Sequence, residues 1–429
     1  MDFGLAVLMA VVVIYGAISL RLGRLWVTAP MIFVLLGALV GEHGLSLLLL
    51  PISSEAIKLL SEVTLALLLF ADASTLHFNT IKADASLPAR LLLIGLPLTV
   101  TLGALLAHLL HPSFELGLGL LVGAILAPTD AALGLAIFNN PLVPVRIRRA
   151  LNVESGLNDG IATPLVTLFI ALSIGEYESA EAFWLMGAVS ELAIGIAVGV
   201  AVGIAGGWLY TQSARKGWTT ATSQQIGNLA LALLAFFASL TLGGNGFIAA
   251  FIGGICFGYF SRHHLHVVTE YTEVTGTMFS FIIWLIFGAS LVVPLLRDFS
   301  AAAFLYALLS LTVIRMLPVI IALSRRHLRW DTQMIMGWFG PRGLATVVFL
   351  LMAIEAAEQI GAETETSMVV SMVGWTILLS VFLHGLSALP LAAWYSKRLK
   401  SAPPDAPELV EVDELVSRRG RTYTPAGPG

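Results

Sequence analysis

Long runs of apolar residues, separated by short polar segments, follow one another along most of this chain. A transmembrane helix needs about 17–25 apolar residues, and the runs reach or approach that length. Gly243-Gly244-Asn245-Gly246 forms a tight turn that separates the eighth run from the ninth. The pattern predicts an all-α polytopic membrane protein with 13 transmembrane helices, at 5–20, 29–48, 56–71, 91–110, 115–138, 150–173, 182–208, 224–242, 245–260, 275–296, 301–323, 332–354 and 368–394.

The composition supports a membrane protein and argues against other classes. Hydrophobic residues make up 57% of the 429 residues and charged residues only 12%, whereas soluble domains carry about 25% charged residues. The net charge of −4 gives no reason to expect a nucleic-acid partner. Cys256 is the one cysteine, which excludes an internal disulfide framework. The first apolar run lacks a preceding basic region and a cleavage site, so we interpret it as a retained span rather than a signal peptide.

Lysine and arginine residues gather in every second loop between the predicted helices. Such residues are enriched on the cytoplasmic side, so the N-terminus is predicted outside and the C-terminus in the cytoplasm, across the cytoplasmic membrane. The Pro-rich, charged segment 401–429 predicts a disordered cytoplasmic tail behind a membrane transporter domain at 1–400. The outer loops contain only Lys58 and Arg297, whereas the inner loops contain Arg21, Arg24, Lys82, Arg90, Arg146, Arg148, Arg149, Arg215, Lys216, Arg262, Arg325, Arg326, Arg329, Lys397, Arg398 and Lys400.

Two predicted helices are interrupted near the middle of the membrane by a proline. Pro128 lies in "ILAPTDAALG" of the fifth run, and Pro341, between Gly340 and Gly343, lies in "WFGPRGLATV" of the twelfth. Proline removes a backbone donor, and broken backbone at membrane depth persists only inside protein or beside a wet cavity. Matching breaks in halves of opposite orientation are typical of secondary transporters. We therefore expect two inverted six-helix repeats with crossed broken helices, at about 1–175 and 224–396, joined by a linker helix at about 182–208.

Asp130, Glu154, Asp159, Arg315 and Arg342 are charged residues that lie within the predicted spans. Isolated charges are costly there, so pairing is expected. Asp130 and Arg342 each follow a break, so they either pair directly or lie at opposite helix ends, where the acid meets amide groups and the base meets carbonyl groups. Glu154 and Arg315 lie at similar depth in the cytoplasmic half, and we expect a structural ion pair between them. Asp159 takes part in neither of these expected pairings.

The stretch Asn152–Gly160, "NVESGLNDG", carries oxygen ligands at helical spacing. Ser155 and Asp159 are four residues apart and share a face of the predicted helix. The break in the fifth span frees the carbonyl group of Thr129. Hydroxyl, carboxylate and carbonyl oxygens are hard ligands that suit an alkali cation. The pattern predicts a cation site of Asp159, Ser155 and Thr129, with Asn158 beside them.

The motifs "APTDAALG", "NVESGLNDG", "GPRGLATVVF" and "TLALLLFADAS" together resemble those of the monovalent cation:proton antiporters. The match is to the electroneutral sodium/proton exchanger branch (NhaP-like), which carries an Asn-Asp pair, and it covers about residues 10–395. The resemblance implies an inverted-repeat fold with a six-helix ion-translocating core, an interface domain and a homodimer. It implies no cofactor, with Na⁺ and H⁺ as transported substrates.

The resemblance also assigns roles to single residues. The positions that match Thr129, Ser155 and Asp159 bind the ion in the family, and Asn158 replaces the first of two adjacent aspartates found in electrogenic relatives. The pairs Glu154–Arg315 and Asp130–Arg342 match internal ion pairs. This chain departs from relatives that carry a glutamate on the third span near the ion path. It has only Asp72 there, which lines the mouth of the path or simply ends the helix.

These residues suggest an antiporter in which Asp159 binds either a proton or a cation. The ligand oxygens suit Na⁺, Li⁺ and K⁺ alike; we favour Na⁺, also Li⁺, with K⁺/H⁺ exchange as the alternative. A cation channel would need a continuous wet path without coupling, and an intramembrane enzyme would need a second catalytic group beside Asp159, where only Ser155 is close. The sequence contains no nucleotide-binding loop, HExxH or nucleophile elbow, so we do not expect an enzyme.

Two groups of histidines remain. His384 lies within the last span and is interpreted as a hydrogen-bonded packing residue, with a pH sensor as the alternative. His263, His264 and His266 are interpreted as part of a solvated cytoplasmic loop, because a metal site would need further ligands.

Overall fold

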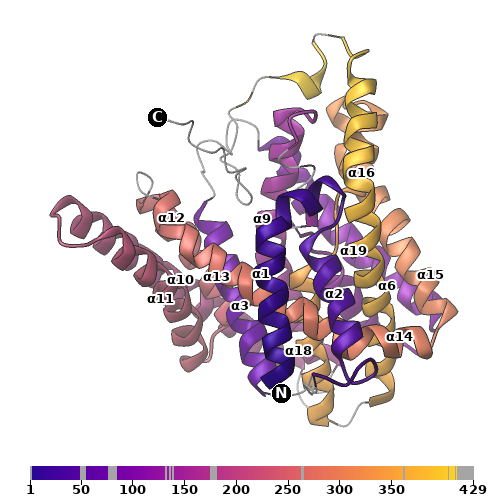
Figure 1. Ribbon diagram of the computed structural model, residues 1–429, viewed down its shortest axis with the longest axis horizontal. Helices are drawn as coiled ribbons and strands as arrows, with labels where there is room; N and C mark the ends of the chain where they lie inside the picture. The colour runs from indigo at the N-terminus through magenta and orange to yellow at the C-terminus, as the bar shows by residue number, and fades with distance from the viewer. Residues whose placement is uncertain are drawn as a thin grey trace.

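The computed structural model describes residues 2–48, 55–75, 85–130, 133–134, 137, 140–173, 181–261, 265–360, 363–403, 405–410 and 412. Within these residues all regular structure is helical (Figure 1), and this confirms the predicted all-α class. Eight helical stretches in the described part of the chain are long and apolar enough to cross a membrane. They are Ala6–Gly23, Ser86–Leu110, Val145–Ser173, Val189–Arg215, Ala221–Thr241, Thr269–Arg297, Ala301–Arg326 and Ser367–Leu399.

The first half of the chain ends in the long helix that carries the "NVESGLNDG" stretch. A short π-helical turn, η1, lies inside the fourth predicted span, between α5 and α6. The helices are α1 (Asp2–Arg24), α2 (Ala29–Val40), α3 (Glu55–Ser74), α5 (Ser86–Arg90), η1 (Leu91–Gly95), α6 (Leu96–Leu110), α7 (Leu116–Ile125) and α9 (Val145–Ser173).

The second half contains two further π-helical turns, and η4 directly precedes Arg315. Its helices are α10 (Glu181–Arg215), α11 (Ala221–Thr241), α12 (Gly246–Phe260), α13 (Leu265–Phe287), η3 (Gly288–Val292), α14 (Val293–Arg297), α15 (Ala301–Leu309), η4 (Ser310–Ile314), α16 (Arg315–Leu323), η5 (Ser324–Arg326), α17 (Trp330–Trp338), α18 (Leu344–Ile360), α19 (Glu363–Leu399) and η6 (Pro407–Leu409).

Every predicted apolar run overlaps one or more of these helices, but five runs fall outside the eight long stretches. Three of them correspond to α2, α3 and α12. The other two contain the prolines: α7 ends at Ile125, before Pro128, and α17 ends at Trp338, before Pro341. Both prolines therefore interrupt their helices, as the sequence predicts.

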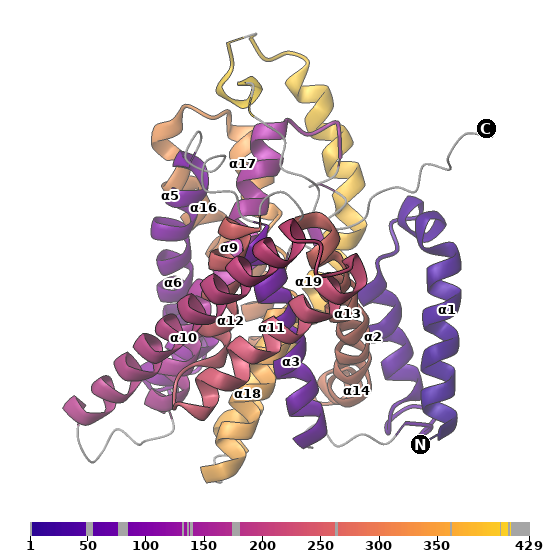
Figure 2. The same ribbon diagram turned by 90° about the vertical axis from the view of Figure 1, so that its left-hand side faces the viewer.

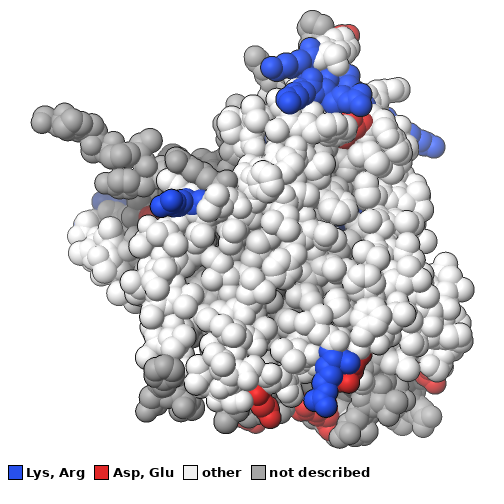
Figure 3. Space-filling view, turned by 45° about the vertical axis from the view of Figure 1, so that its right-hand side comes forward, with Lys and Arg blue, Asp and Glu red and all other residues white. Residues whose placement is uncertain are grey.

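The helices divide into an upright group and an inclined group. Figure 2 shows α1 and α2 side by side at one edge of the molecule, while α10 and α12 cross it at an incline. Figure 3 shows a broad belt nearly free of charged residues on this face, with most of its basic side chains at one end and acidic side chains, beside a basic one, at the other. An apolar belt between charged ends is the surface that a bilayer-spanning protein presents to lipid.

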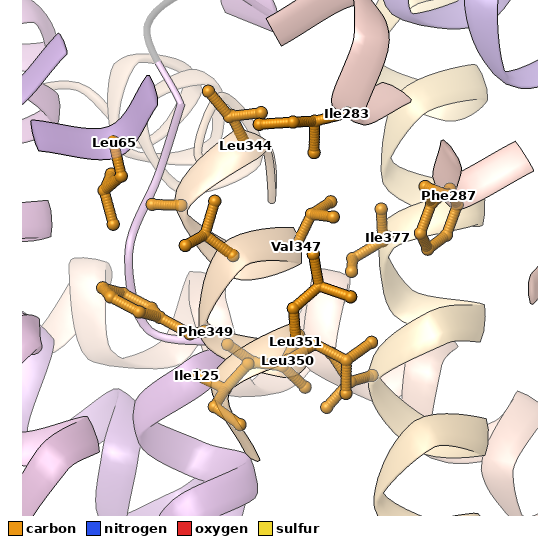
Figure 4. Close-up of a cluster of buried hydrophobic side chains, with 14 of the residues drawn as sticks. Leu65, Ile125, Ile283, Phe287, Leu344, Val347, Phe349, Leu350, Leu351 and Ile377 are labelled. Carbon is orange, nitrogen blue, oxygen red and sulfur yellow. The ribbon is translucent and has the colours of Figure 1, made fainter. Parts of the chain in front are cut away.

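Helix α18, which begins directly after the second break, lies at the centre of the packed interior. Figure 4 shows it between helices α3, α7, α13 and α19. Residues 344–351 of this helix are all buried, so its first residues are held in place by packing. The labelled residues of this cluster are Leu65, Ile125, Ile283, Phe287, Leu344, Val347, Phe349, Leu350, Leu351 and Ile377.

Residues 405–410, within the segment predicted as a tail, contact the body of the protein through Glu408. Glu408 is 0% exposed, and its Oε1 accepts hydrogen bonds from the backbone N–H of Arg329 at 2.7 Å and from the Thr332 hydroxyl at 2.9 Å. Arg329 is the N-cap residue of α17, so a carboxylate there satisfies an end group that the helix leaves unpaired. Hydrogen bonding to Arg329 lowers the pKa of Asp331 beside it. Residues 404, 411 and 413–429 lie outside the described residues.

Candidate ion-binding site

Helix α9 and the break after α7 meet through three buried polar side chains. The Ser155 hydroxyl donates to the carbonyl oxygen of Thr129 at 2.6 Å. Nδ2 of Asn158 donates to the Thr129 hydroxyl, also at 2.6 Å. All three residues are at most 3% exposed. Three of the predicted ligand residues therefore lie together, and they cross-link two segments that are about 26 residues apart in the sequence.

Asp159 follows Asn158 on the same helix and is partly buried. Its backbone carbonyl accepts a hydrogen bond from the Thr163 hydroxyl at 2.8 Å, and the next residue, Gly160, lies where a Cβ would come within 2.6 Å of the Phe251 ring. Oδ1 of Asn158 is buried without a hydrogen-bond partner among the described residues. A buried amide oxygen of this kind is a ready ligand for a cation or for water.

The two breaks contact each other directly. The backbone N–H of Asp130 donates to the carbonyl oxygen of Pro341 at 2.8 Å, and Oδ2 of Asp130 accepts from the N–H of Leu344, the first residue of α18, at 2.9 Å. Nη1 of Arg342 lies 3.3 Å from the carbonyl oxygens of both Ala127 and Pro128. Of the two arrangements that the sequence left open, this geometry has the acid at a helix N-terminus and the base beside carbonyl groups after α7. Each charge thus faces the favourable end of a helix dipole.

Glu154 and Arg315 form a buried ion pair between α9 and the start of α16. Nη1 and Nη2 of Arg315 donate to Oε1 and Oε2 of Glu154 at 2.7 and 3.0 Å. Both residues are 2% exposed. The two parallel hydrogen bonds give the fork geometry that makes an arginine–carboxylate pair strong and directional.

Gly340 and Gly343 are required by close approach rather than by backbone angles. A Cβ at position 340 would overlap Nε of Arg315, and a Cβ at position 343 would overlap the Asp130 carboxylate. The glycines on either side of Pro341 therefore make room for one member of each charged set.

Two residues of α19 that the site prediction did not include also reach the second break. Oγ of Ser380 accepts a hydrogen bond from the backbone N–H of Arg342 at 2.7 Å, and Nε2 of His384 lies 2.8 Å from the carbonyl oxygen of Trp338. The signal in the sequence is a pair of polar residues four apart in an otherwise apolar run.

The remaining candidate residues are Asp72 and the histidines near the start of α13. Asp72 lies in the last turn of α3 and is partly buried. Among the described residues no group of three or more His, Cys, Asp or Glu side chains could hold a metal ion. His263 and His264 lie outside the described residues, while His266 belongs to α13.

Comparisons with known proteins identify what this chain resembles. A profile of the family described as sodium/hydrogen exchanger, transmembrane, matches residues 7–394. The chain is 24% identical over 428 residues to "K(+)/H(+) antiporter NhaP" of Alkalimonas amylolytica, which covers 96% of this chain and 71% of that protein. It is 25% identical over 332 residues to "Na(+)/H(+) antiporter ApNhaP" of Aphanothece halophytica, covering 74% of this chain and 62% of that protein. The structure of the sodium proton antiporter MjNhaP1 from Methanocaldococcus jannaschii shares the fold, with a TM-score of 0.74 at 20% identity, over 91% of this chain and 98% of that one.

Proposed function

The chain belongs to the sodium/hydrogen exchanger family, a family of transporters and not of enzymes, and we propose that it exchanges one monovalent cation for one proton. Na⁺ is the proposed cation, with Li⁺ also accepted. The observation that supports this most is the position of Asp159, directly after the buried Asn158–Thr129–Ser155 cluster and within the helix that contacts the first break.

Asp159 is the proposed site at which cation and proton compete. A proton neutralises the carboxylate directly, whereas a cation does so with the help of oxygen atoms of Ser155 and Thr129. The Ser155 hydroxyl donates its hydrogen to Thr129, so its oxygen lone pairs remain available to a cation. A charged, unloaded carboxylate is costly in the low-dielectric barrier. Only the two loaded states then cross readily, and this enforces exchange.

Asn158 makes the proposed exchange electroneutral. An amide occupies the position beside Asp159 where a second carboxylate would carry a further proton or charge. The ion pair Glu154–Arg315 already fixes one negative and one positive charge against each other. One cation therefore replaces one proton, and no net charge moves.

The proposed architecture goes beyond the helices that the structure describes, because it assigns membrane spans, repeats and an orientation. It consists of 13 spans, with inverted repeats at about 1–175 and 224–396, a linker at about 182–208, an outside N-terminus and a cytoplasmic C-terminus. The basic end of the surface in Figure 3 supports this orientation, because basic residues favour the cytoplasmic side. We also propose that the antiporter is a homodimer in the cytoplasmic membrane.

K⁺/H⁺ exchange is the second candidate, because relatives that align with most of the chain are named K(+)/H(+) antiporters. The test is cation-induced pH change in sealed proteoliposomes, scanned over Na⁺, Li⁺ and K⁺, with Asp159→Asn as the control. Proton movement driven by Na⁺ and Li⁺ supports the first proposal, and movement driven by K⁺ alone supports the second. Cation flux without proton movement would indicate a channel and would overturn both.

A further inference from the structure

The break between α17 and α18 removes hydrogen bonds that a continuous helix would have, and one of them would join Trp338 to Arg342. In an unbroken helix the carbonyl oxygen of Trp338 would accept from the N–H of Arg342, four residues later. Helix α17 ends at Trp338 instead, and α18 begins at Leu344. A carbonyl and an amide left unpaired at membrane depth would each cost free energy.

Both of these groups have a partner on one turn of α19. Oγ of Ser380 accepts from the N–H of Arg342 at 2.7 Å, and Nε2 of His384 contacts the carbonyl oxygen of Trp338 at 2.8 Å. A carbonyl oxygen can only accept, so this contact requires a proton on Nε2. The same Trp338 carbonyl oxygen also accepts a hydrogen bond from the N–H of Gly340 at 2.8 Å. The ring of Trp338 stacks on the ring of His384, with centroids 4.9 Å apart.

The Ser380–His384 pair is connected within itself and buried. Nδ1 of His384 lies 3.3 Å from the Ser380 hydroxyl oxygen and 3.0 Å from the Ser380 carbonyl oxygen. Ser380 is 0% exposed, His384 is 1% exposed and Arg342 is 0% exposed. Water therefore does not replace these contacts easily, and their geometry is set by the packing of α19.

Contacts continue from this break to the ion site. Arg342 reaches the carbonyl oxygen of Pro128 at 3.3 Å, and Pro128 precedes Thr129. The Thr129 carbonyl and hydroxyl groups accept from Ser155 and Asn158 at 2.6 Å each. A shift of Arg342 would thus displace Pro128 and the neighbouring Thr129, whose oxygen atoms are proposed ligands of the cation.

We propose that Ser380 and His384 are positioning residues for transport. They hold apart the two ends of the broken α17–α18 helix, and this fixes Arg342 and, through it, the Thr129 oxygens at which the cation is bound. The inference rests on the proposed function for its effect on transport, but the hydrogen bonds that it names can be tested without transport.

The first test is hydrogen–deuterium exchange on the purified full-length protein. Ser380→Ala removes the acceptor of the Arg342 amide, and we expect about three- to tenfold faster exchange in the peptide that covers 339–346. Ser380→Thr keeps the hydroxyl and should preserve protection. Unchanged exchange in Ser380→Ala would overturn the proposal, whatever the transport assay shows.

The second test is the cation dependence of exchange in proteoliposomes. Ser380→Ala and His384→Leu should raise the half-saturating cation concentration about three- to tenfold, and Ser380→Thr and His384→Gln, which retain a hydroxyl and an N–H donor, should restore it. A merely structural role would lower the amount of folded protein and the maximal rate but leave half-saturation unchanged, and that result would overturn the proposal.

Ser387→Ala is the matched control, because the Ser387 hydroxyl accepts from the ring Nε1 of the same Trp338 at 2.9 Å but does not contact its backbone carbonyl. An equal effect of Ser387→Ala and Ser380→Ala would assign the effect to packing around Trp338 and overturn the proposal.

If Ser380→Ala does not fold, Ser380→Cys replaces it, since a thiol is a weak acceptor of similar size. If Ser380→Cys then shows the amide exchange rate and the half-saturating cation concentration of the wild type, the positioning role is refuted. If the wild-type protein shows no exchange of any cation, the proposed function fails, while hydrogen–deuterium exchange still decides the role of the pair.

Discussion

Glu154 and Arg315, which are 161 residues apart in the sequence, face each other through two parallel hydrogen bonds of 2.7 and 3.0 Å. The pair joins α9, which carries the proposed ion ligands, to α16 in the second half of the chain. Gly340 gives the Arg315 side chain the room to lie there. The two halves of the molecule are therefore joined by a charged contact close to the breaks.

Removing either member of this pair should destabilise the protein strongly. Glu154→Ala or Arg315→Ala leaves an uncompensated charge in the interior, at a cost of about 3–5 kcal/mol. The double variant should lose less than the sum of the two single variants. Thermal unfolding in detergent, measured by tryptophan fluorescence, provides the comparison. Simple additivity would mean that the two residues do not interact energetically.

Asp159→Asn should abolish exchange while the protein still inserts and folds. The amide cannot exchange a proton or neutralise a cation, but it has nearly the same shape as the carboxylate. Cation-driven pH change in proteoliposomes measures the activity, and the melting temperature of the same preparation reports folding. Rapid exchange by a well-folded Asp159→Asn protein would disprove the assignment of the site.

Exchange should be insensitive to membrane potential. A net charge moved by each cycle would couple to voltage by about 2.3 kcal/mol per 100 mV, whereas one-for-one exchange moves none. A potassium–valinomycin gradient imposes the voltage while Na⁺ is the substrate. Initial rates that follow the voltage would show that a second charge travels with the site.

Asn158→Asp is the companion variant for electroneutrality. The Asn158 amide donates to the Thr129 hydroxyl, and a carboxylate loses that donor and adds a charge. We therefore expect lower activity without voltage dependence, because Arg315 stays paired with Glu154. Voltage-driven exchange in this single variant would show that Arg315 does not stay paired with Glu154.

Gly343→Ala should impair both folding and transport. The added Cβ would overlap the Asp130 carboxylate, and overpacking of this kind costs about 1–3 kcal/mol. Gly16→Ala is the control, because nothing lies within 4 Å of a Cβ at that position of α1. The two melting temperatures and exchange rates are compared directly. Equal behaviour of the two variants would show that the breaks do not approach each other as described.

Glu408→Ala should loosen the C-terminal segment from the body of the protein. The variant leaves the Arg329 amide and the Thr332 hydroxyl without the acceptor that they share, and the loss of a helix-capping acceptor costs about 0.5–2 kcal/mol. Limited proteolysis at the C-terminus and thermal unfolding provide the measurements. Asp405→Ala, which changes an exposed acid in the same segment, should behave like the wild type, and equal protease sensitivity of all three proteins would refute the contact.

The helical class and the positions of the breaks follow from local features of the sequence. Apolar runs determine where helices form, because backbone groups in lipid must be satisfied within the helix. Pro128 and Pro341 interrupt their helices wherever these pack, since proline lacks the N–H donor. Ser155 and Asp159 share a face of α9 for an equally local reason, their spacing of four residues.

Which groups meet across the two breaks was decided only by the tertiary structure. The sequence allowed Asp130 and Arg342 to pair directly or to face helix ends, and the crossing of the two segments places them at backbone groups. The polar pair Ser380 and His384 is visible in the sequence, but the partners of Ser380 and Glu408 are not, because they lie 38 and 76–79 residues away. A serine in an apolar span and a glutamate in a polar tail resemble many others until packing brings an orphan amide within reach. Secondary structure is set by short-range spacing, whereas the partner of a buried polar group is set by which helices pack together.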